Sequence, residues 1–159
     1  MYEMDKDELL EAAARLTPQW LAGFFDGEGW VSAYKANSSY QVTVGVGQAD
    51  PRILSLVALR FGVGISERST KGHIHYNLRL HGKMALPFLH FIKDHVICKR
   101  RQVEAAIKMA GEMRHTSGGS GGLTDSEIAL RAELAETIRR ANHEVCTKAN
   151  SQSGKESFR

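Results

Sequence analysis

The chain has 159 residues, a mass of 17.6 kDa and a net charge of +3, which is enough material for one sizeable hydrophobic core. Hydrophobic residues make up 42% of the chain and charged residues 25%, values that exclude wholesale disorder. Its apolar runs are too short to span a membrane, so we expect no membrane partner. The first residues lack the pattern of a signal peptide, which favours an intracellular location over secretion.

The two cysteines, Cys98 and Cys146, are too few for a disulfide framework and lack a zinc spacing. We expect one buried thiol and one thiol in a polar tail, both in a reducing compartment. The isoelectric point near 9.0 permits an anionic partner without demanding one.

The first half of the chain alternates between helical and strand patterns. Apolar spacing predicts a helix over residues 5–16. Thr17 and Pro18 then predict the start of a second helix, which is apolar on every side and ends in the acid-and-glycine segment 26–29. Two-residue alternation predicts strands over 30–35 and 40–47, joined by a turn.

The second half again predicts a helix followed by two strands, and the rest of the chain is predicted to be helical. In chain order we expect a helix over 51–61, strands over 65–70 and 73–80, helices over 84–95 and 99–113, a flexible loop over 114–122, and a helix from a capping box at 124–127 to about residue 142. This pattern predicts one α+β domain over residues 1–143. Residues 144–159 are expected to form a polar, flexible tail.

Residues 21–29 read LAGFFDGEG and resemble the LAGLIDADG motif of homing endonucleases. Five positions match letter for letter: Leu21, Ala22, Gly23, Asp26 and Gly29. The order of elements behind the motif also fits that family. The resemblance implies an αββαββα fold with a four-stranded antiparallel DNA-binding sheet and C-terminal helices. It further implies an intron-encoded or similarly mobile endonuclease that cuts both strands of a long DNA target to leave short 3′ overhangs.

One copy of the motif implies a homodimer acting on a pseudo-palindromic target. Small residues let two helix backbones approach closely, and this explains a helix that is apolar all round. The expected dimer interface consists of Trp20, Leu21, Ala22, Gly23, Phe25 and Asp26.

The end of that helix would bring Glu28 from each chain to the two-fold axis. Two carboxylates with phosphate oxygens and water suit Mg²⁺, with the Gly27 backbone carbonyl as a second ligand and Mn²⁺ or Ca²⁺ as possible substitutes. No small-molecule cofactor is expected. The alternative is that Asp26 and Glu28 merely cap a turn.

The resemblance also implies a glutamine at the end of the second strand, a basic residue soon after it and a lysine before a late helix. Gln48, Arg52 and Lys99 stand at these places. Gln48 could orient water, Arg52 could hold the phosphate, and Lys99 could assist deprotonation of water. Two simpler alternatives remain open, namely a solvated Arg52 and a Lys99 that only binds backbone phosphates.

A four-stranded sheet could lie in the DNA major groove, which accepts β-ribbons. Candidate base contacts are Trp30, Ser32, Tyr34, Gln41, Thr43, His73, His75, Asn77 and Arg79, and candidate phosphate contacts are Lys35, Arg68, Lys71 and Lys83. Gly45 and Gly47 could allow close approach of the backbone to DNA. The faces taken by Glu67 and Arg68 stay open, as does a core position for Trp30 and Tyr34.

Two other functions remain on the same residues. A non-cleaving nucleic-acid binder, such as an RNA maturase or a DNA-binding regulator, would have no need for Glu28 beside Lys99. A small metal-binding protein using His73 and His75 on one strand face lacks an obvious third ligand.

Overall fold

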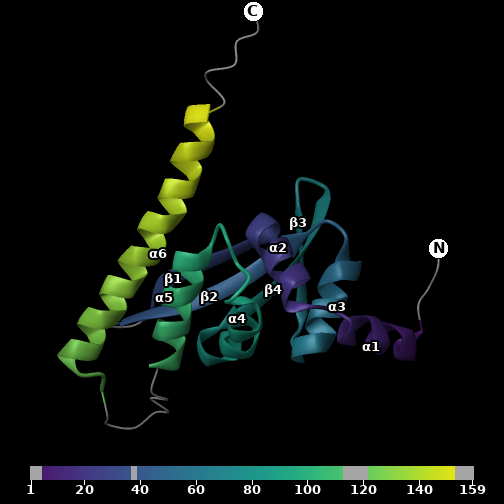
Figure 1. Cartoon of the computed structure of the whole chain (residues 1–159), viewed down its shortest axis with the longest axis horizontal. Helices are drawn as coiled ribbons and strands as arrows, with labels where there is room; N and C mark the ends of the chain where they lie inside the picture. Colours follow the sequence, from purple (N-terminus) through teal and green to yellow (C-terminus); the bar gives the residue numbers. More distant parts are fainter. Residues whose placement is uncertain (1–4, 37–38, 113–121, 153–159) are drawn as a thin grey trace, which may run out of the picture.

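The computed structural model describes residues 5–36, 39–112 and 122–152, with the backbone alone over residues 145–152. In chain order the elements are α1 (Lys6–Ala14), α2 (Pro18–Glu28), β1 (Gly29–Ala36), β2 (Ser39–Gln48), α3 (Pro51–Phe61), β3 (Ile65–Thr70), β4 (His73–His81), a 3₁₀ turn η1 (Gly82–Ala85), α4 (Leu86–Ile92), α5 (Arg100–Gly111) and α6 (Asp125–Gln152) (Figure 1). The predicted α+β order is confirmed. Within the described ranges, no helix has the length and apolar character to cross a membrane.

Local sequence signals set several helix ends. The Thr17 hydroxyl accepts a hydrogen bond from the Trp20 backbone N–H at 3.2 Å, and Pro18 occupies the first turn of α2. Gly62 ends α3 with a φ of +65°, a left-handed conformation that glycine adopts at little cost. The predicted start of α2 and end of α3 are therefore confirmed.

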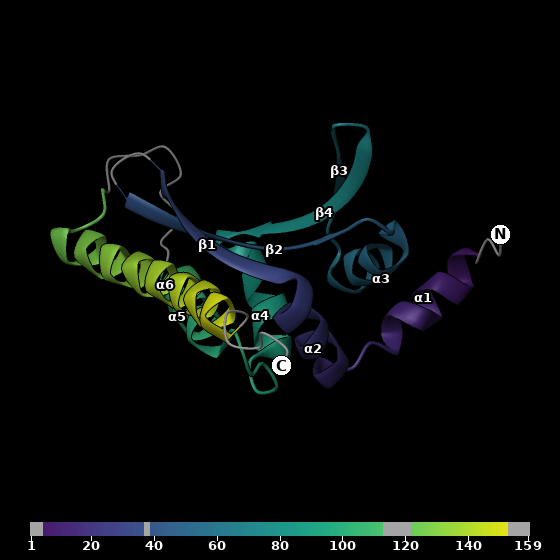
Figure 2. The same ribbon diagram turned by 90° about the horizontal axis from the view of Figure 1, so that it is seen from above.

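The four strands form one antiparallel sheet in the order β1-β2-β4-β3. Figure 2 shows the sheet curving above α2, α3, α4, α5 and α6, with no described helix on its other side. One face of the sheet is therefore covered by helices and the other is open.

The hydrophobic core lies between the covered face and the helices. Val42, Val44 and Val46 are at most 1% exposed there, as the predicted alternation of β2 requires. Phe25 of α2 packs edge-on against Phe88 of α4, with ring centroids 5.5 Å apart. This packing fixes the position of α2 beneath the sheet.

Two predicted helices differ from the structure in extent. The expected helix over 84–95 becomes η1 followed by a short α4, because Pro87 favours a helix start and is disfavoured in a helix interior. Helix α6 continues to Gln152, so the first residues of the predicted tail are helical.

Smaller differences concern buried positions. The buried stripe of α6 includes Arg131 and Leu134, whereas Ala132 between them is exposed. Cys98 is exposed, so the expected buried thiol is wrong. Residues 113–121, most of the predicted loop, and the side chain of Cys146 lie outside the described part of the chain.

Candidate active site and nucleic-acid interface

Helix α2 passes directly into strand β1 without an intervening turn. The helix extends through Glu28, so its predicted end within the segment 26–29 is confirmed. A Cβ atom at Gly29 would lie 2.1 Å from the Phe25 ring, so only glycine lets the chain leave the helix here. This junction leaves Glu28 exposed at the start of the sheet.

Asp26 links this junction to the beginning of α5. Its carboxylate accepts hydrogen bonds from the backbone N–H groups of Ile97 at 2.7 Å and Lys99 at 3.0 Å. The Lys99 ammonium group in turn donates to the backbone carbonyl of Asp26. The suggestion that Asp26 caps a turn thus holds in part, because it caps the segment leading into α5 and thereby places Lys99 beside the end of α2.

The sheet register brings Gln48 to the same place. Gly29 pairs with Val46, so the chain just before Gly29 lies beside the last residues of β2. Gln48 ends that strand and is half-buried opposite Tyr76 of β4. The end of α2, the end of β2 and the beginning of α5 therefore lie near one another, and these three ends carry Glu28, Gln48 and Lys99.

Arg52 lies in the first turn of α3, and its side chain is 86% exposed. Its guanidinium forms an ion pair with Asp50, whose carboxylate also accepts the Arg52 backbone N–H at 3.0 Å. The hydrogen bond from the Arg52 side chain is the main cause that lowers the pKa of Asp50 to about 2, and the pairing raises the pKa of Arg52. Any phosphate held by Arg52 must compete with Asp50.

The Glu28 carboxylate and the Gly27 carbonyl are oxygen donors of the kind that bind a divalent metal ion. The Gly27 carbonyl belongs to the last turn of α2, whose carbonyls have no partner within the helix. Carboxylate and carbonyl oxygens are ligands that Mg²⁺ accepts. Among the described residues, no three His, Cys, Asp or Glu side chains gather as a metal-binding group. The Asp26 carboxylate is engaged by two backbone N–H groups, so Glu28 is the carboxylate left for a metal ion at the end of α2.

The exposed face of α2 differs from the predicted dimer interface. Leu21, Ala22 and Phe25 are 0% exposed within the chain, so the prediction that they contact a partner is wrong. The carboxylate of Asp26 is used by its own chain. The surface of α2 that is available to a partner includes a stripe formed by Trp20, Gly23, Phe24 and Gly27, with the ring centroids of Trp20 and Phe24 stacked 5.3 Å apart.

Strand pairing determines which residues share the open face of the sheet, because directly paired residues point to the same side. The open face consists of Trp30, Ser32, Tyr34, Gln41, Thr43, Gly45, Gly47, Ser66, Arg68, Thr70, His73, His75, Asn77, Arg79 and His81. Arg68 pairs with His75 and lies on this face, whereas Glu67 pairs with Tyr76 and lies on the other. The open face therefore contains no acidic residue.

Trp30 lies across β2 on this face. An added Cβ at Gly45 would come within 2.4 Å of the Trp30 ring. The interpretation that Gly45 admits the DNA backbone is therefore wrong, because the indole fills that space. The Arg79 guanidinium lies 5.7 Å from the centre of the same indole. The alternative of a core position for Trp30 is likewise excluded by its open-face position.

A second group of contacts lies further along the face. Thr43 is 5% exposed, and its hydroxyl is 3.0 Å from Nδ1 of His81. The Tyr34 hydroxyl donates to the Gln41 side-chain carbonyl at 3.0 Å, and its ring meets His81 edge-on. The sequence prediction missed His81, although one more step of the alternation in β4 would have included it.

The remaining predicted phosphate contacts are exposed but scattered. Lys71 lies in the turn between β3 and β4, and Lys83 lies in η1. Lys35 pairs with Tyr40 near the tip of the first hairpin, on the covered side of the sheet. These lysines lie away from the centre of the open face.

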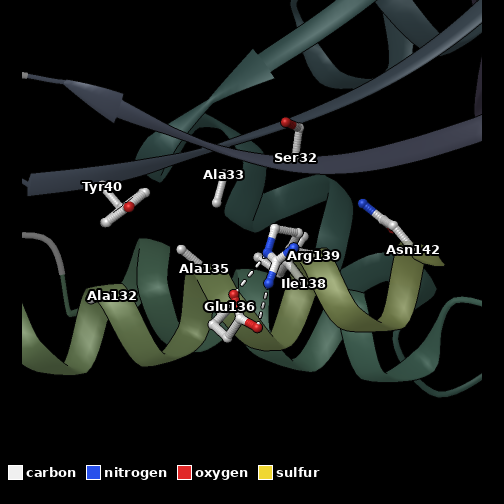
Figure 3. Close-up of a pocket in the computed structure, with 9 residues that line it drawn as sticks. All are labelled: Ser32, Ala33, Tyr40, Ala132, Ala135, Glu136, Ile138, Arg139 and Asn142. Carbon is white, nitrogen blue, oxygen red and sulfur yellow. Dashed lines mark hydrogen bonds and ion pairs between the residues drawn. The ribbon is translucent and has the colours of Figure 1, made fainter. Parts of the chain in front are cut away.

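A separate hollow of about 190 Å³ lies between α6 and β1. Figure 3 shows Ala33 pointing toward α6 and Ser32 pointing away from it, above the sheet. Hydrogen bonds from Arg139 and Arg140 lower the pKa of Glu136, which lines this hollow, to about 2. The hollow contains none of the four predicted catalytic residues.

Solved structures of homing endonucleases are similar to this chain. The endonuclease I-CvuI, in complex with its target, shares a TM-score of 0.61 and 18% identity over 86% of this chain and 85% of that chain. The archaeal intron-encoded homing endonuclease I-Vdi141I, complexed with DNA, matches with a TM-score of 0.64 and 18% sequence identity. The match covers 78% of this chain and 82% of that chain.

A third match is the LAGLIDADG homing endonuclease I-GzeII in complex with its DNA target. It shares a TM-score of 0.61 and 19% identity over 75% of this chain but only 42% of that chain. No protein-family model and no curated protein matches the sequence. The fold of this chain is therefore that of the LAGLIDADG homing endonucleases, as the resemblance of residues 21–29 implies.

Proposed function

We propose that the chain is a site-specific DNA endonuclease that acts as a homodimer on a long, nearly palindromic target and leaves short 3′ overhangs. The observation that carries this proposal is the acid-free open face, which leads directly to the three ends that carry Glu28, Gln48 and Lys99. A polar and basic sheet face suits a polyanion and can enter the major groove. The DNA-bound structures of I-CvuI and I-Vdi141I support the same interpretation.

The cleavage chemistry is assigned to the residues at the end of α2. Mg²⁺ bound by Glu28 and the Gly27 carbonyl would stabilise charge on the phosphate and favour deprotonation of water. Lys99, held at Asp26, adds positive charge beside that place, and Gln48 can orient the attacking water by hydrogen bonds. Arg52 can bind the phosphate once its guanidinium has left the ion pair with Asp50.

The homodimer is proposed on the exposed face of α2. Glycine within a helix costs about 1 kcal/mol relative to alanine. A Cβ at Gly23 or Gly27 would meet nothing within 4 Å, so the chain's own packing does not require either glycine. Close approach of a second α2 would explain both glycines, and it would bring the second Glu28 to the metal.

The proposal extends to the origin of the protein. An endonuclease of this kind would be intron-encoded or carried by a similar element and would act inside the cell on the host genome. The acid-free open face supports a nucleic-acid target.

A cleavage assay with a library of candidate insertion-site DNA tests this function. We expect discrete double-strand ends in Mg²⁺ that are lost in Glu28→Gln, which keeps the size of the side chain but removes its charge. Mn²⁺ should replace Mg²⁺, and a chelator should abolish the cuts. Sequence-specific retention of DNA without cuts, by both proteins, would overturn the endonuclease in favour of a maturase or regulator.

A further inference from the structure

Two hydrogen-bond donors lie side by side on the open face of β4. Arg79 and His81 are two residues apart in the strand, so their side chains point the same way and are about 7 Å apart along it. Each contacts a residue from a neighbouring strand, and the two sets of contacts share no residue.

Arg79 lies in one row with Gly45 and Trp30, because Gly45 of β2 pairs with Trp30 of β1 on one side and with Arg79 of β4 on the other. Gly45 leaves room for the Trp30 ring to lie across β2, and the Arg79 guanidinium stacks over that ring at 5.7 Å. Stacking on an aromatic ring restricts the guanidinium while leaving its edge donors available. Among the described residues Arg79 has no acidic partner, so Trp30 acts as a positioning residue for a free fork of donors.

His81 is held by Thr43. A hydroxyl that donates to Nδ1 requires the neutral imidazole to carry its proton on Nε2. The imidazolium form also carries a proton on Nε2, and it then donates from Nδ1 to the hydroxyl oxygen. A neutral ring that instead donates from Nδ1 to the hydroxyl leaves Nε2 as an acceptor. Within the described part of the chain Nε2 has no other partner, so an acceptor placed opposite it selects the states that carry a proton there.

We propose that β4 binds two guanines in each half-site, one through Arg79 and one through His81. This inference rests on the proposed DNA endonuclease function. In the major groove guanine offers two acceptors, O6 and N7, whereas adenine pairs an acceptor with a donor and cytosine offers a donor. Two outward donors about 7 Å apart therefore match two guanines within a few base pairs of each other.

Selection from an inverted-repeat DNA library with a randomised half-site tests the proposal. The full chain is used in Ca²⁺, because the similar protein I-SmaMI is bound to uncleaved DNA in the presence of calcium ions. We expect two strongly preferred guanines in each half-site. Arg79→Ala should reduce one preference and His81→Ala the other, each by about ten-fold.

Variants of the positioning residues separate this role from simple contact. Gly45→Ala should displace Trp30 and weaken only the guanine that depends on Arg79. Thr43→Val should weaken only the guanine that depends on His81, and Thr43→Ser should restore it by keeping the hydroxyl. Thr137→Val is the matched control, because it removes a hydroxyl bond to the Glu133 carbonyl within α6, on the covered side of the sheet, and should leave both guanines preferred.

Each remaining outcome decides against the inference in a recognisable way. One such outcome is that the chain selects specific half-sites while neither Arg79→Ala nor His81→Ala changes a guanine preference. That result overturns the inference and leaves the endonuclease proposal standing. Unchanged guanine preference in both Gly45→Ala and Thr43→Val overturns the positioning roles. Absence of any sequence-specific retention by the unmodified chain overturns the inference together with the proposed function.

Discussion

Asp26 joins two distant parts of the chain through a single side chain and its own carbonyl. Replacing it with alanine removes two hydrogen bonds to backbone N–H groups, and bonds to a charged group contribute about 1.5–3 kcal/mol each. We expect Asp26→Ala to lower the free energy of unfolding by a few kcal/mol and to slow cleavage, because Lys99 loses its position. Denaturant unfolding and single-turnover cleavage measure the two effects.

A comparison with Lys99→Met separates the two roles of this link. That change removes the ammonium group but keeps both bonds to the Asp26 carboxylate, so it should slow cleavage with little loss of stability. Cleavage by Asp26→Ala at the unmodified rate, under conditions where the variant is folded, would show that Asp26 does not position Lys99.

Asp50 and Arg52 form an exposed pair whose pKa shifts have a definite sign. The folded-state pKa of Asp50, about 2, is below its usual 3.8. The small stabilisation from the pair is therefore fully present above pH 3.8 and is lost as the pH falls toward 2. An NMR titration of the Asp50 carboxyl should show this low midpoint, and Arg52→Gln should return it toward 3.8.

If Arg52 binds a DNA phosphate as proposed, its pairing with the charged Asp50 opposes that contact at neutral pH. Asp50→Asn keeps an acceptor for the first turn of α3 but frees Arg52. We expect tighter DNA binding, with log K falling more steeply against log salt by about one phosphate contact. Adding Arg52→Gln should cancel the gain. An affinity of Asp50→Asn no higher than that of the unmodified chain would place Arg52 away from the DNA.

Helix α2 carries its two roles on opposite faces. One face fills the core, and the other holds Gly23 and Gly27 in open space. We expect Gly23→Ala to raise the free energy of unfolding of the monomer by about 1 kcal/mol and to weaken the dimer, because a methyl group separates the two helices. Thermal unfolding at low concentration and sedimentation equilibrium measure these opposite changes.

Gly111→Ala is the control for this test. Gly111 ends α5, also has open space around its Cβ position, and lies outside α2. It should stabilise the monomer without weakening the dimer. A Gly23→Ala dimer as tight as the unmodified one would remove α2 from the proposed interface.

Helix ends were predictable where the signal is local. The side chain of Thr17 bonds a backbone group three residues away, and Gly62 adopts a conformation that few other residues favour. The directions of the α2 side chains were not predictable, because an all-apolar helix gives no sign of which face meets its own core. The continuation of α6 past residue 142 was missed because the sequence there is mostly polar and shows no clear apolar stripe.

The candidate site was predictable as a set of residues but not as an assembly. The motif at residues 21–29 indicated Glu28, and the family pattern that the resemblance implies indicated Gln48 and Lys99. The bonds of Asp26 to residues 71 and 73 positions away could not be inferred, since no local pattern reports such a contact. The position of Trp30 over Gly45 likewise depends on strand register.

At the scale of the whole molecule, the pairing of β2 with β4 decides what the open face can do. That pairing joins two hairpins that are separated by α3, and it places Gly45 beside Arg79. The sequence predicted the alternation of β2 and β4 but not the faces of β3 or the order of the strands in the sheet. Each chain has one open face and one carboxylate, Glu28, that is proposed to bind the metal, so the proposed function needs two chains.

Mixed dimers test whether the two chains share each active centre. Random pairing of equal amounts of unmodified chain and Glu28→Gln leaves roughly a quarter of the dimers with two intact carboxylates. If each centre needs Glu28 from both chains, double-strand cleavage should fall to roughly a quarter of that by the same total amount of unmodified dimer. No nicked DNA should then accumulate. Nicked DNA from the mixed dimers would show instead that each chain builds its own centre. A Glu28→Gln chain that also carries Gly23→Gln is the control, because the longer side chain should block pairing through α2 and leave the activity of the unmodified chain intact.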